Sequence, residues 1–455
     1  MHYFPERKSP FPQELIDYIV DELAEDSNSL QACALTSRSF RRPSQRILFQ
    51  LVSLEGVHCS IKPLRARGKR PTRCQRLYAI LEASPHIAGL IRDLSFTGDY
   101  MDRWNDNALP LVLSRMTNIR RFFFSSDPET SSLLNFSAFP NPVKDALFAL
   151  LQSHSVEHIG IHGAEFSNLA DFCRVVSGGA GLKSLALFSV SLSLGKGKRS
   201  KNYDIPQFPP TTTSRLLSLT VFVEYSTFPN SLWDWFFGPR SPYSLDYLEH
   251  FGLVGDTPNE LHILGRVLAA NNGSMKELNI TLFDEHGAGF PDTLDLSSPH
   301  TINIGFTIHS SNPLSCQKIL DSWCRSFESS RDLDHLKTLN ICIFARFDDL
   351  CDYEFTAPGW KRMDRLLSSV TSGLAVKIDL KALETDDDDS EDDEDDNEDD
   401  NLLLPPRVFT KLKEALPLTN ANGHLKVSQT LSDGFDSLFP HLFGIGSSEG
   451  LYARP

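Results

Sequence analysis

The sequence of 455 residues lacks the features of several large protein classes. No stretch approaches the roughly 20 consecutive apolar residues of a membrane span, and the N-terminus lacks the apolar core of a signal peptide. The eight cysteines form no Cys-x-x-Cys pair and have no histidine at zinc-finger spacing, so we expect free thiols. These absences predict a soluble intracellular protein, cytoplasmic or nuclear, with no membrane partner.

Signatures of catalysis are also missing. The sequence contains no phosphate-binding P-loop, nucleophile elbow, His-Glu-x-x-His zinc motif or dinucleotide-binding fingerprint. His154, His158 and His162 are four residues apart, but the surrounding pattern places them across a helix, a turn and a strand, where helical spacing does not apply. We therefore expect no metal, no cofactor and no enzymatic activity, and interpret the chain as a binding protein.

The negative charge is concentrated in one segment. The formal net charge is -15, and residues 384–400 hold 14 carboxylates and no base, so the rest of the chain carries a net charge of -1. Such a segment has no apolar surface to offset its chain entropy, and its charges repel one another. We expect residues 384–401 to form an acidic disordered insertion.

Residues 77–383 repeat a two-part pattern of an amphipathic helix followed by a short apolar run with strand character. The expected strands start at irregular intervals of 26 to 38 residues, and several share a Leu-x-x-Leu-x-Leu/Ile skeleton. Their ranges are 91–96, 119–124, 156–161, 182–187, 216–223, 248–253, 275–282, 302–308, 336–343 and 374–380. Because each helix returns the chain to the same end of the sheet, this alternation predicts parallel strands.

Two α/β architectures fit this alternation: a repeat solenoid with a curved parallel sheet, and a doubly wound sheet. The shared leucine skeleton and the lack of a Gly-rich phosphate loop after any strand favour the solenoid. This part of the chain resembles a leucine-rich repeat, although the Asn or Cys ladder of regular repeats is mostly absent, so the repeats are degenerate. Residues 402–446 resemble one more repeat that caps the solenoid, and residues 447–455 look like a tail.

Basic residues cluster at two places outside the repeats. Residues 55–76 contain a run of Lys and Arg interrupted by Pro and Gly, which we interpret as a basic linker, and residues 192–214 form a basic loop. The first cluster lacks the interleaved aromatic residues of a nucleic-acid interface, which argues against a nucleic-acid partner. Nuclear import and a solvated connector remain alternative interpretations of both clusters.

The N-terminal segment, residues 11–54, has a different pattern. Pro12 can occupy the first position of a helix whose apolar residues form two rows. Leu15 and Ile19 lie along one edge, and Ile16 and Val20 lie along the other, so one row can face a core and the second a partner. Ser27 is the expected N-cap of a second short helix.

These residues resemble the F-box, a module of three helices. The family runs Leu-Pro, an acidic residue with Leu, spaced aliphatic residues, then Ser-Arg or Ser-Lys and an aromatic residue. The matching residues are Phe11-Pro12, Glu14-Leu15, Ile19, Leu23, Ser37-Arg38 and Phe40. Phe11 replaces the usual Leu and Phe40 stands where Trp is most common, and neither change removes an apolar contact.

The resemblance implies the function of an F-box protein, the substrate-recognition subunit of an SCF-type ubiquitin ligase. Such a subunit binds a Skp-type adaptor, which joins it to a cullin, while the repeat domain binds an unknown target protein. The residues that we expect on the adaptor face, or in the packing that shapes it, are Pro12, Leu15, Ile16, Ile19, Leu35 and Phe40. The alternatives are a non-ligase repeat scaffold, in which the N-terminal helices are only a cap, and an enzyme built on a doubly wound sheet.

Overall fold

The computed structural model describes residues 11–55, 71–97, 106–126, 133–192, 214–222, 230–238, 241–255, 258–271, 273–282, 293–308, 313–330, 333–353, 355–370, 373–383 and 404–429. The chain divides into two compact units, residues 1–214 and 215–455. The acidic insertion and the tail expected from the sequence, with most of the basic linker and the basic loop, lie outside the described residues. The protein is α/β, and its main sheet is parallel.

The first unit begins with three helices, α1 (Gln13–Asp21), α2 (Ser27–Thr36) and α3 (Arg38–Leu48). The residues that start them differ slightly from the sequence-based prediction. Pro12 is the N-cap of α1, one position before the first helical residue, and Asp26 replaces Ser27 as the N-cap of α2. One Asp26 carboxylate oxygen accepts hydrogen bonds from the backbone N–H groups of Asn28 and Ser29, both at 3.1 Å, which satisfies two of the donors that a helix start leaves unpaired.

A small apolar core holds these three helices together. Ile16, Val20 and Leu30 are fully buried in it, and Leu23, Phe40, Ile47 and Leu48 pack around them. At the C-terminal end of α1, Asp21 Oδ1 lies 2.8 Å from Arg46 Nη2 of α3. The helices α1 and α2 are therefore both anchored on α3, whose residues contact each of them.

A proline in α3 creates a further link between α1 and α3. Pro43 lies inside α3 and has no N–H to donate to the carbonyl of Ser39, four residues earlier. The side chain of Gln13 lies beside that carbonyl, and its Nε2 donates to Ser39 O at 3.4 Å. The start of α1 is thereby fixed next to the start of α3.

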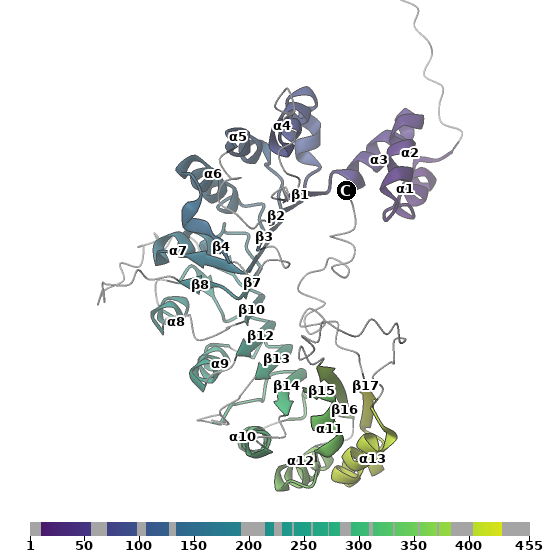
Figure 1. Cartoon of the computed structure of the whole chain (residues 1–455), viewed down its shortest axis with the longest axis vertical. Coiled ribbons are helices and arrows are strands. Elements are labelled where there is room, and N and C mark those ends of the chain that lie inside the picture. Colours follow the sequence, from purple (N-terminus) through teal and green to yellow (C-terminus); the bar gives the residue numbers. More distant parts are fainter. Residues whose placement is uncertain are drawn as a thin grey trace, which may run out of the picture. The chain divides into compact units, whose positions relative to one another are not determined.

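The main sheet of the first unit contains β1 (Leu51–Glu55), β2 (Asp93–Thr97), β3 (Arg121–Ser125), β5 (His158–His162) and β7 (Ser184–Phe188). These strands pair in the order in which they occur in the chain, and every pairing is parallel. The helices that follow are α4 (Arg73–Ala83), α5 (Ala108–Arg115), α6 (Asn141–Leu151) and α7 (Leu169–Ser177), each packed on the next. Figure 1 shows them on one side of the strands.

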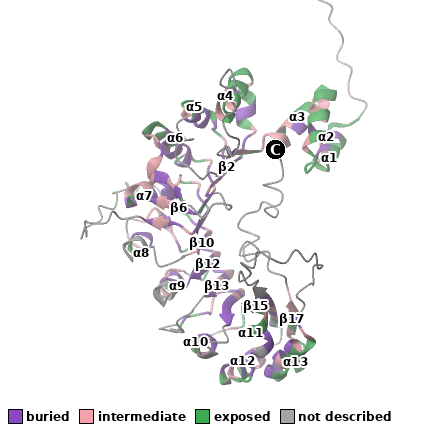
Figure 2. Ribbon diagram, viewed as in Figure 1, coloured by how far each residue is buried: buried purple, intermediate pink, exposed green. Residues whose placement is uncertain are grey.

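Alternating burial along β3 shows which face of the strand packs against the helices. Phe122 and Phe124 of β3 are buried, and a chain of aromatic contacts joins Phe124 through Phe136 to Phe148 of α6, with centroid distances of 5.9 Å in both steps. Phe136 belongs to a short 3-10 helix (Phe136–Ala138) near a small second parallel sheet of β4 (Leu134–Asn135), β6 (Ala164–Phe166) and β8 (Ser191–Leu192). Figure 2 shows the buried residues along these strands and more exposed residues on the outer helices.

The main sheet of the second unit also follows the chain order. Its strands are β10 (Ser218–Phe222), β12 (His250–Gly255), β13 (Glu277–Leu282), β14 (Thr301–Ile308), β15 (Thr338–Arg346), β16 (Ala375–Leu383) and β17 (Leu425–Gln429), all parallel. Its helices are α8 (Asn230–Phe236), α9 (Pro258–Ala270), α10 (Pro313–Ser329), α11 (Phe347–Asp352), α12 (Pro358–Ser369), α13 (Pro406–Ala415) and α14 (Pro417–Ala421). A short pairing joins β9 (Ser214–Arg215) and β11 (Tyr243–Ser244).

The same backbone contact recurs at the strand starts of both units. Two consecutive N–H groups converge on one carbonyl at the start of the preceding strand, as where Glu157 and His158 both donate to Arg120 O. The next strand repeats it with Lys183 and Ser184 on Glu157 O, and the second unit repeats it with Lys276 and Glu277 on Glu249 O. Shared acceptors of this kind are common where regular structure begins or ends. The strand starts are thus structurally equivalent.

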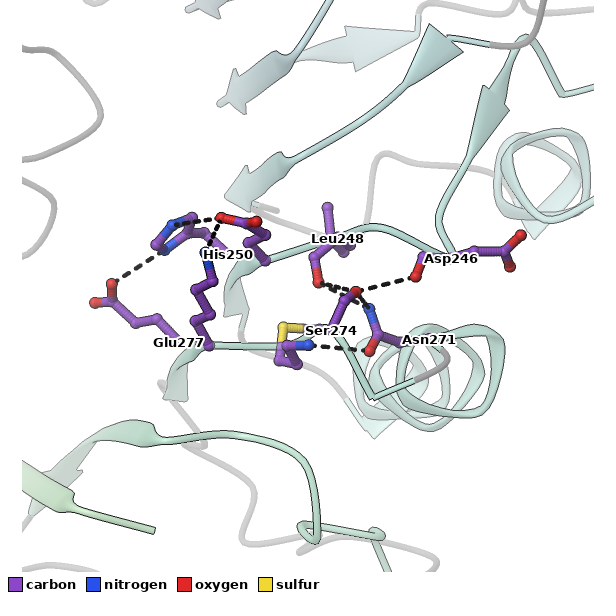
Figure 3. A network of polar contacts seen from close by, with 9 residues as sticks. Asp246, Leu248, His250, Asn271, Ser274 and Glu277 are labelled. Carbon is purple, nitrogen blue, oxygen red and sulfur yellow. Dashed lines mark hydrogen bonds and ion pairs between the residues drawn. The ribbon is translucent and has the colours of Figure 1, made fainter. Parts of the chain in front are cut away.

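Polar side chains close the turns between helices and strands. Asn271, at the end of α9, donates through Nδ2 to Leu248 O at 2.8 Å and accepts from Met275 N at 3.1 Å (Figure 3). Ser274 Oγ adds bonds to Asp246 O at 3.0 Å and Leu248 O at 3.1 Å. Since these bonds satisfy the backbone of the two turns that precede β12 and β13, they hold the two strand starts side by side.

Eight of the ten strand ranges predicted from the sequence begin two residues before the observed strands. The reason is that the first leucine of the skeleton, as at Leu182 and Leu216, is buried just before its strand rather than within it. The strand β1 was not among the predicted strands, because its residues stand at the end of the segment that resembles an F-box.

Candidate functional site

Exposed apolar side chains are concentrated in the first helices of the described part of the chain. In the described part of the chain as a whole, eleven large hydrophobic residues are exposed: Phe11, Leu15, Tyr18, Ile19, Leu35, Leu51, Ile80, Leu111, Leu133, Tyr247 and Leu418. Five of these eleven lie between residues 11 and 35. A concentration of exposed apolar side chains on a folded protein is typical of an interaction surface.

The two rows of α1 separate in the structure. Ile16 and Val20 are fully buried in the core of the three helices, whereas Leu15 is 43% exposed and Ile19 is 39% exposed. Tyr18, at 63% exposure, lies next to them at helical spacing. We call Leu15, Tyr18 and Ile19, with Phe11 before the helix and Leu35 of α2, the N-terminal apolar surface.

Leu35 of α2 lies close in sequence to the start of α3. Leu35 stands two residues before Ser37, the N-cap of α3, and is 82% exposed. The bond from Gln13 to Ser39 O holds the start of α1 beside this same junction. The exposed end of α2 therefore lies close in sequence to the Ser39 carbonyl that contacts the start of α1.

The six residues predicted for an adaptor face fall into two groups. Pro12, Leu15, Ile19 and Leu35 are exposed, whereas Ile16 is a core residue and Phe40 is partly buried against that core. Phe40 is held by the N-cap of its helix, because its backbone N–H donates to Ser37 Oγ at 3.4 Å. Phe11 and Tyr18 are exposed apolar residues that were not among the six.

Acidic and basic residues flank the N-terminal apolar surface on different helices. Carboxylates occur along α1 and the turn after it, at Glu14, Asp17, Asp21, Glu22 and Glu25, whereas α3 carries Arg38, Arg41, Arg42 and Arg46. Most of these side chains are exposed. A polar rim around an apolar centre is the usual composition of a protein–protein interface.

A second candidate surface lies on the sheet of the second unit, on the face opposite the helices. Asn279 of β13, Asn303 of β14 and Asn340 of β15 occupy one register across three neighbouring strands. All three are half-buried and alternate with fully buried aliphatic residues, such as Ile302 and Ile304 in β14. Phe306, of the same parity as these aliphatic residues, contacts Trp360 of α12, so the asparagines face away from the helices.

The asparagines form a hydrogen-bonded row, which we call the asparagine row. Asn340 Nδ2 donates to Asn303 Oδ1 at 2.5 Å, and Asn303 Nδ2 donates to Asn279 Oδ1 and, at 3.0 Å, to Glu277 Oε1. The register continues to Lys377 of β16 and Lys426 of β17. Sequence reasoning missed this row, although each member stands in a Leu/Ile-Asn-Ile triplet that the sequence shows.

The metal-ligating side chains of the described residues do not cluster, and several of their thiols are buried. Among them no group of three or more His, Cys, Asp and Glu residues is placed to hold a metal ion. Burial raises the pKa of the thiols of Cys173, Cys316 and Cys324 to about 12, so these cysteines remain protonated and are poor nucleophiles. Burial also lowers the pKa of His158, which is a strand residue of β5.

Among the described residues, no helix is both long and apolar enough to span a bilayer. No protein-family model matches the chain, and no curated protein is a significant match.

Proposed function

We propose that the chain is the substrate-recognition subunit of an SCF-type ubiquitin ligase, with α1 to α3 acting as an F-box. In this proposal the helices bind a Skp-type adaptor, which joins the chain to a cullin, and the repeats hold a target protein. The protein itself catalyses nothing, and the ubiquitin transfer takes place elsewhere in the complex.

The observation that carries the proposal is the N-terminal apolar surface. Leu15, Ile19 and Leu35 are exposed on helices whose own core, formed around Ile16, Val20 and Leu30, is already complete. These exposed side chains are therefore available for a contact with another protein, and their burial there would supply binding energy. If the helices were only a cap for the repeats, their apolar side chains would be expected to lie against the repeats.

Three features support a leucine-rich-repeat-like solenoid with a curved parallel sheet for the rest of the chain. Within each unit the strands pair in chain order without a reversal, whereas a doubly wound sheet places its ligand at a reversal of strand order. The convergent N–H groups recur at successive strand starts. The helices α4 to α7 also stack in sequence, each on the next.

Binding of the purified full chain to a Skp-type adaptor tests the proposal. In the triple variant Leu15→Asp, Ile19→Asp and Leu35→Asp, three carboxylates would have to be desolvated at the interface, so we expect adaptor affinity to fall by at least about 100-fold. Because all three positions are exposed, the variant should keep its circular-dichroism spectrum and its melting temperature.

A matched control is the double variant Leu111→Asp and Leu418→Asp, two residues that are each 47% exposed outside the N-terminal apolar surface. We expect it to bind the adaptor within about twofold of the wild type, since exposed substitutions away from an interface change little. Equal adaptor recovery with the triple variant and the wild type would sink the ligase assignment. A non-ligase scaffold would then be the better description.

A further inference from the structure

The three asparagines of the asparagine row conflict with the usual composition of a strand. Asn is depleted in β-strands, because its side chain does not pack well on a pleated surface and competes for backbone hydrogen bonds. The second unit nevertheless places Asn at the same register of β13, β14 and β15. Departures from local structural preference that cluster at one place often mark a functional surface.

The hydrogen bonds within the row leave donors at one end and acceptors at the other. Asn279 uses its Oδ1 to accept from Asn303, and among the described residues its Nδ2 has no partner. The neighbouring position on β12 is Gly252, which has no side chain to offer one. At the other end, Asn340 donates through Nδ2 to Asn303, and its Oδ1 has no partner in the described part of the chain.

These unmet groups have the chemistry that pairs with a peptide backbone. A backbone carbonyl accepts from a carboxamide N–H, and a backbone N–H donates to a carboxamide oxygen. Neighbouring strands lie about 4.8 Å apart, so four steps from β13 to β17 span about 19 Å. An extended segment of about six residues has that length, at about 3.3 Å per residue.

The end of the row on β16 and β17 is basic. Lys377 follows Asn340 in register, and Lys426 follows Lys377. Lys377 Nζ lies 2.8 Å from Asp379, while the exposed Lys426 makes no ion pair with any described residue. The carboxylates on this face already have partners, because Glu277 contacts His250 at 3.2 Å and Asp379 accepts from Ser428. The open charge at this end is therefore positive.

Two residues after Asn303, on the same face of β14, stands a glycine, Gly305. Gly305 of β14 lies beside Thr281 of β13, and a Cβ at Gly305 would stand 2.5 Å from Thr281 Oγ1. Only glycine therefore fits at this position without displacing Thr281. The Thr281 side chain thus lies over Gly305, and both residues are buried, so the exposed polar groups of this face are those of the asparagine row itself.

We propose that the asparagine row binds an extended acidic peptide segment of a target protein. The segment crosses β13 to β17, exchanges backbone hydrogen bonds with Asn279 and Asn340, and places a carboxylate beside Lys426. This inference adds the class of target to the proposed function. It rests on the proposed function only for the statement that the bound peptide belongs to a target of the ligase. Because it is tested without the adaptor, either proposal can fail alone.

A library of random 12-residue peptides displayed on phage, selected on the purified full chain, is the probe. We expect enriched sequences to contain Asp and Glu, and labelled synthetic copies to bind more weakly as salt is raised. Binding to the double variant Asn303→Leu and Asn340→Leu should fall at least tenfold. Leu has nearly the shape of Asn and suits a strand, so this variant should fold, which its melting temperature checks. Binding to Lys426→Glu should also fall at least tenfold.

Matched controls carry the same changes at exposed positions of the same unit outside the asparagine row: Asn420→Leu with Asn422→Leu, and Lys413→Glu. We expect both to bind within twofold of the wild type. Selection of no peptide, selection of basic peptides, or equal affinity for the row variant and the wild type would each overturn the proposal. Peptide binding that appears only after deletion of residues 384–400 would overturn it as well, because the chain's own acidic segment would then be the occupant.

Discussion

In the N-terminal helices, a single side chain donates to a backbone carbonyl that a proline leaves without its helical donor, and this bond joins two helices. Pro43 cannot donate to Ser39 O, and Gln13 Nε2 donates to that carbonyl instead, at 3.4 Å. Gln13 Nε2 also donates to Asp17 Oδ1 at 2.8 Å, a contact within α1 that does not depend on Pro43. A double-mutant cycle separates the two contacts, because only the first is coupled to position 43.

We expect Gln13→Ala to lower the opening free energy of α1 and α3 by about 0.5–1 kcal/mol in the wild-type background. In the Pro43→Ala background, the new N–H at position 43 pairs with Ser39 O. Gln13→Ala should therefore lower the opening free energy by about 0.5 kcal/mol less than in the wild-type background. Hydrogen exchange of the α1 and α3 amides measures both values. Identical losses in the two backgrounds would show that the link across the helices contributes nothing.

At the scale of single elements, α14 depends on a side chain from another helix. The buried Asp364 of α12 accepts from Leu418 N at 3.0 Å, Thr419 N at 2.8 Å and Thr419 Oγ1 at 2.7 Å. Leu418 and Thr419 stand in the first turn of α14, whose N–H groups have no partner within the helix. Asp364 therefore caps α14 from outside, and its negative charge suits the N-terminal end of a helix.

We expect Asp364→Ala to destabilise the segment around α13, α14 and β17 by about 2–3 kcal/mol, because it removes the acceptor of the buried Thr419 N–H and hydroxyl and of the partly buried Leu418 N–H. Asp364→Asn keeps one acceptor oxygen and should lose less. Hydrogen exchange across residues 404–429 measures the effect. Glu414→Ala, at an exposed position of α13, is the control and should change exchange little. An unchanged exchange rate in Asp364→Ala would contradict the capping role.

The elements themselves were predictable to different degrees. Leucines three residues apart located the strands of the main sheets, because such residues must be buried for parallel strands to pack against helices. The helical spacing of α1 also separated buried Ile16 from exposed Leu15. The short strand β1 could not be recognised, because its pairing with β2 depends on a partner more than 40 residues away.

The asparagine row shows why the polar surface was harder to predict than the core. Each Leu/Ile-Asn-Ile triplet is visible in the sequence, but a single Asn in a strand carries little information about its neighbours. Asn303 and Asn340 become adjacent only once the register of β14 and β15 is known. The strand of Asn303 lacks the first leucine of the skeleton, since Pro299 stands in its place, so its register relative to β15 does not follow from the pattern.

At the scale of the whole molecule, the excess negative charge and the N-terminal apolar surface lie in different segments of the chain. Residues 384–400 hold 14 of the carboxylates, and the rest carries a net charge of only -1. The N-terminal apolar surface is built from uncharged side chains. If the adaptor is held mainly by burial of these side chains, its affinity should depend little on ionic strength, because salt screens charges rather than apolar contact.

We therefore expect adaptor affinity to change less than about threefold between roughly 0.05 and 0.5 M NaCl, and less than about threefold on deletion of residues 384–400. Isothermal titration calorimetry of the full chain and the deletion variant measures both. Peptide binding at the asparagine row should weaken over the same range of salt, since a carboxylate beside Lys426 is screened. A steep loss of adaptor affinity with salt would instead assign adaptor recognition to the acidic side chains of α1 and the arginines of α3.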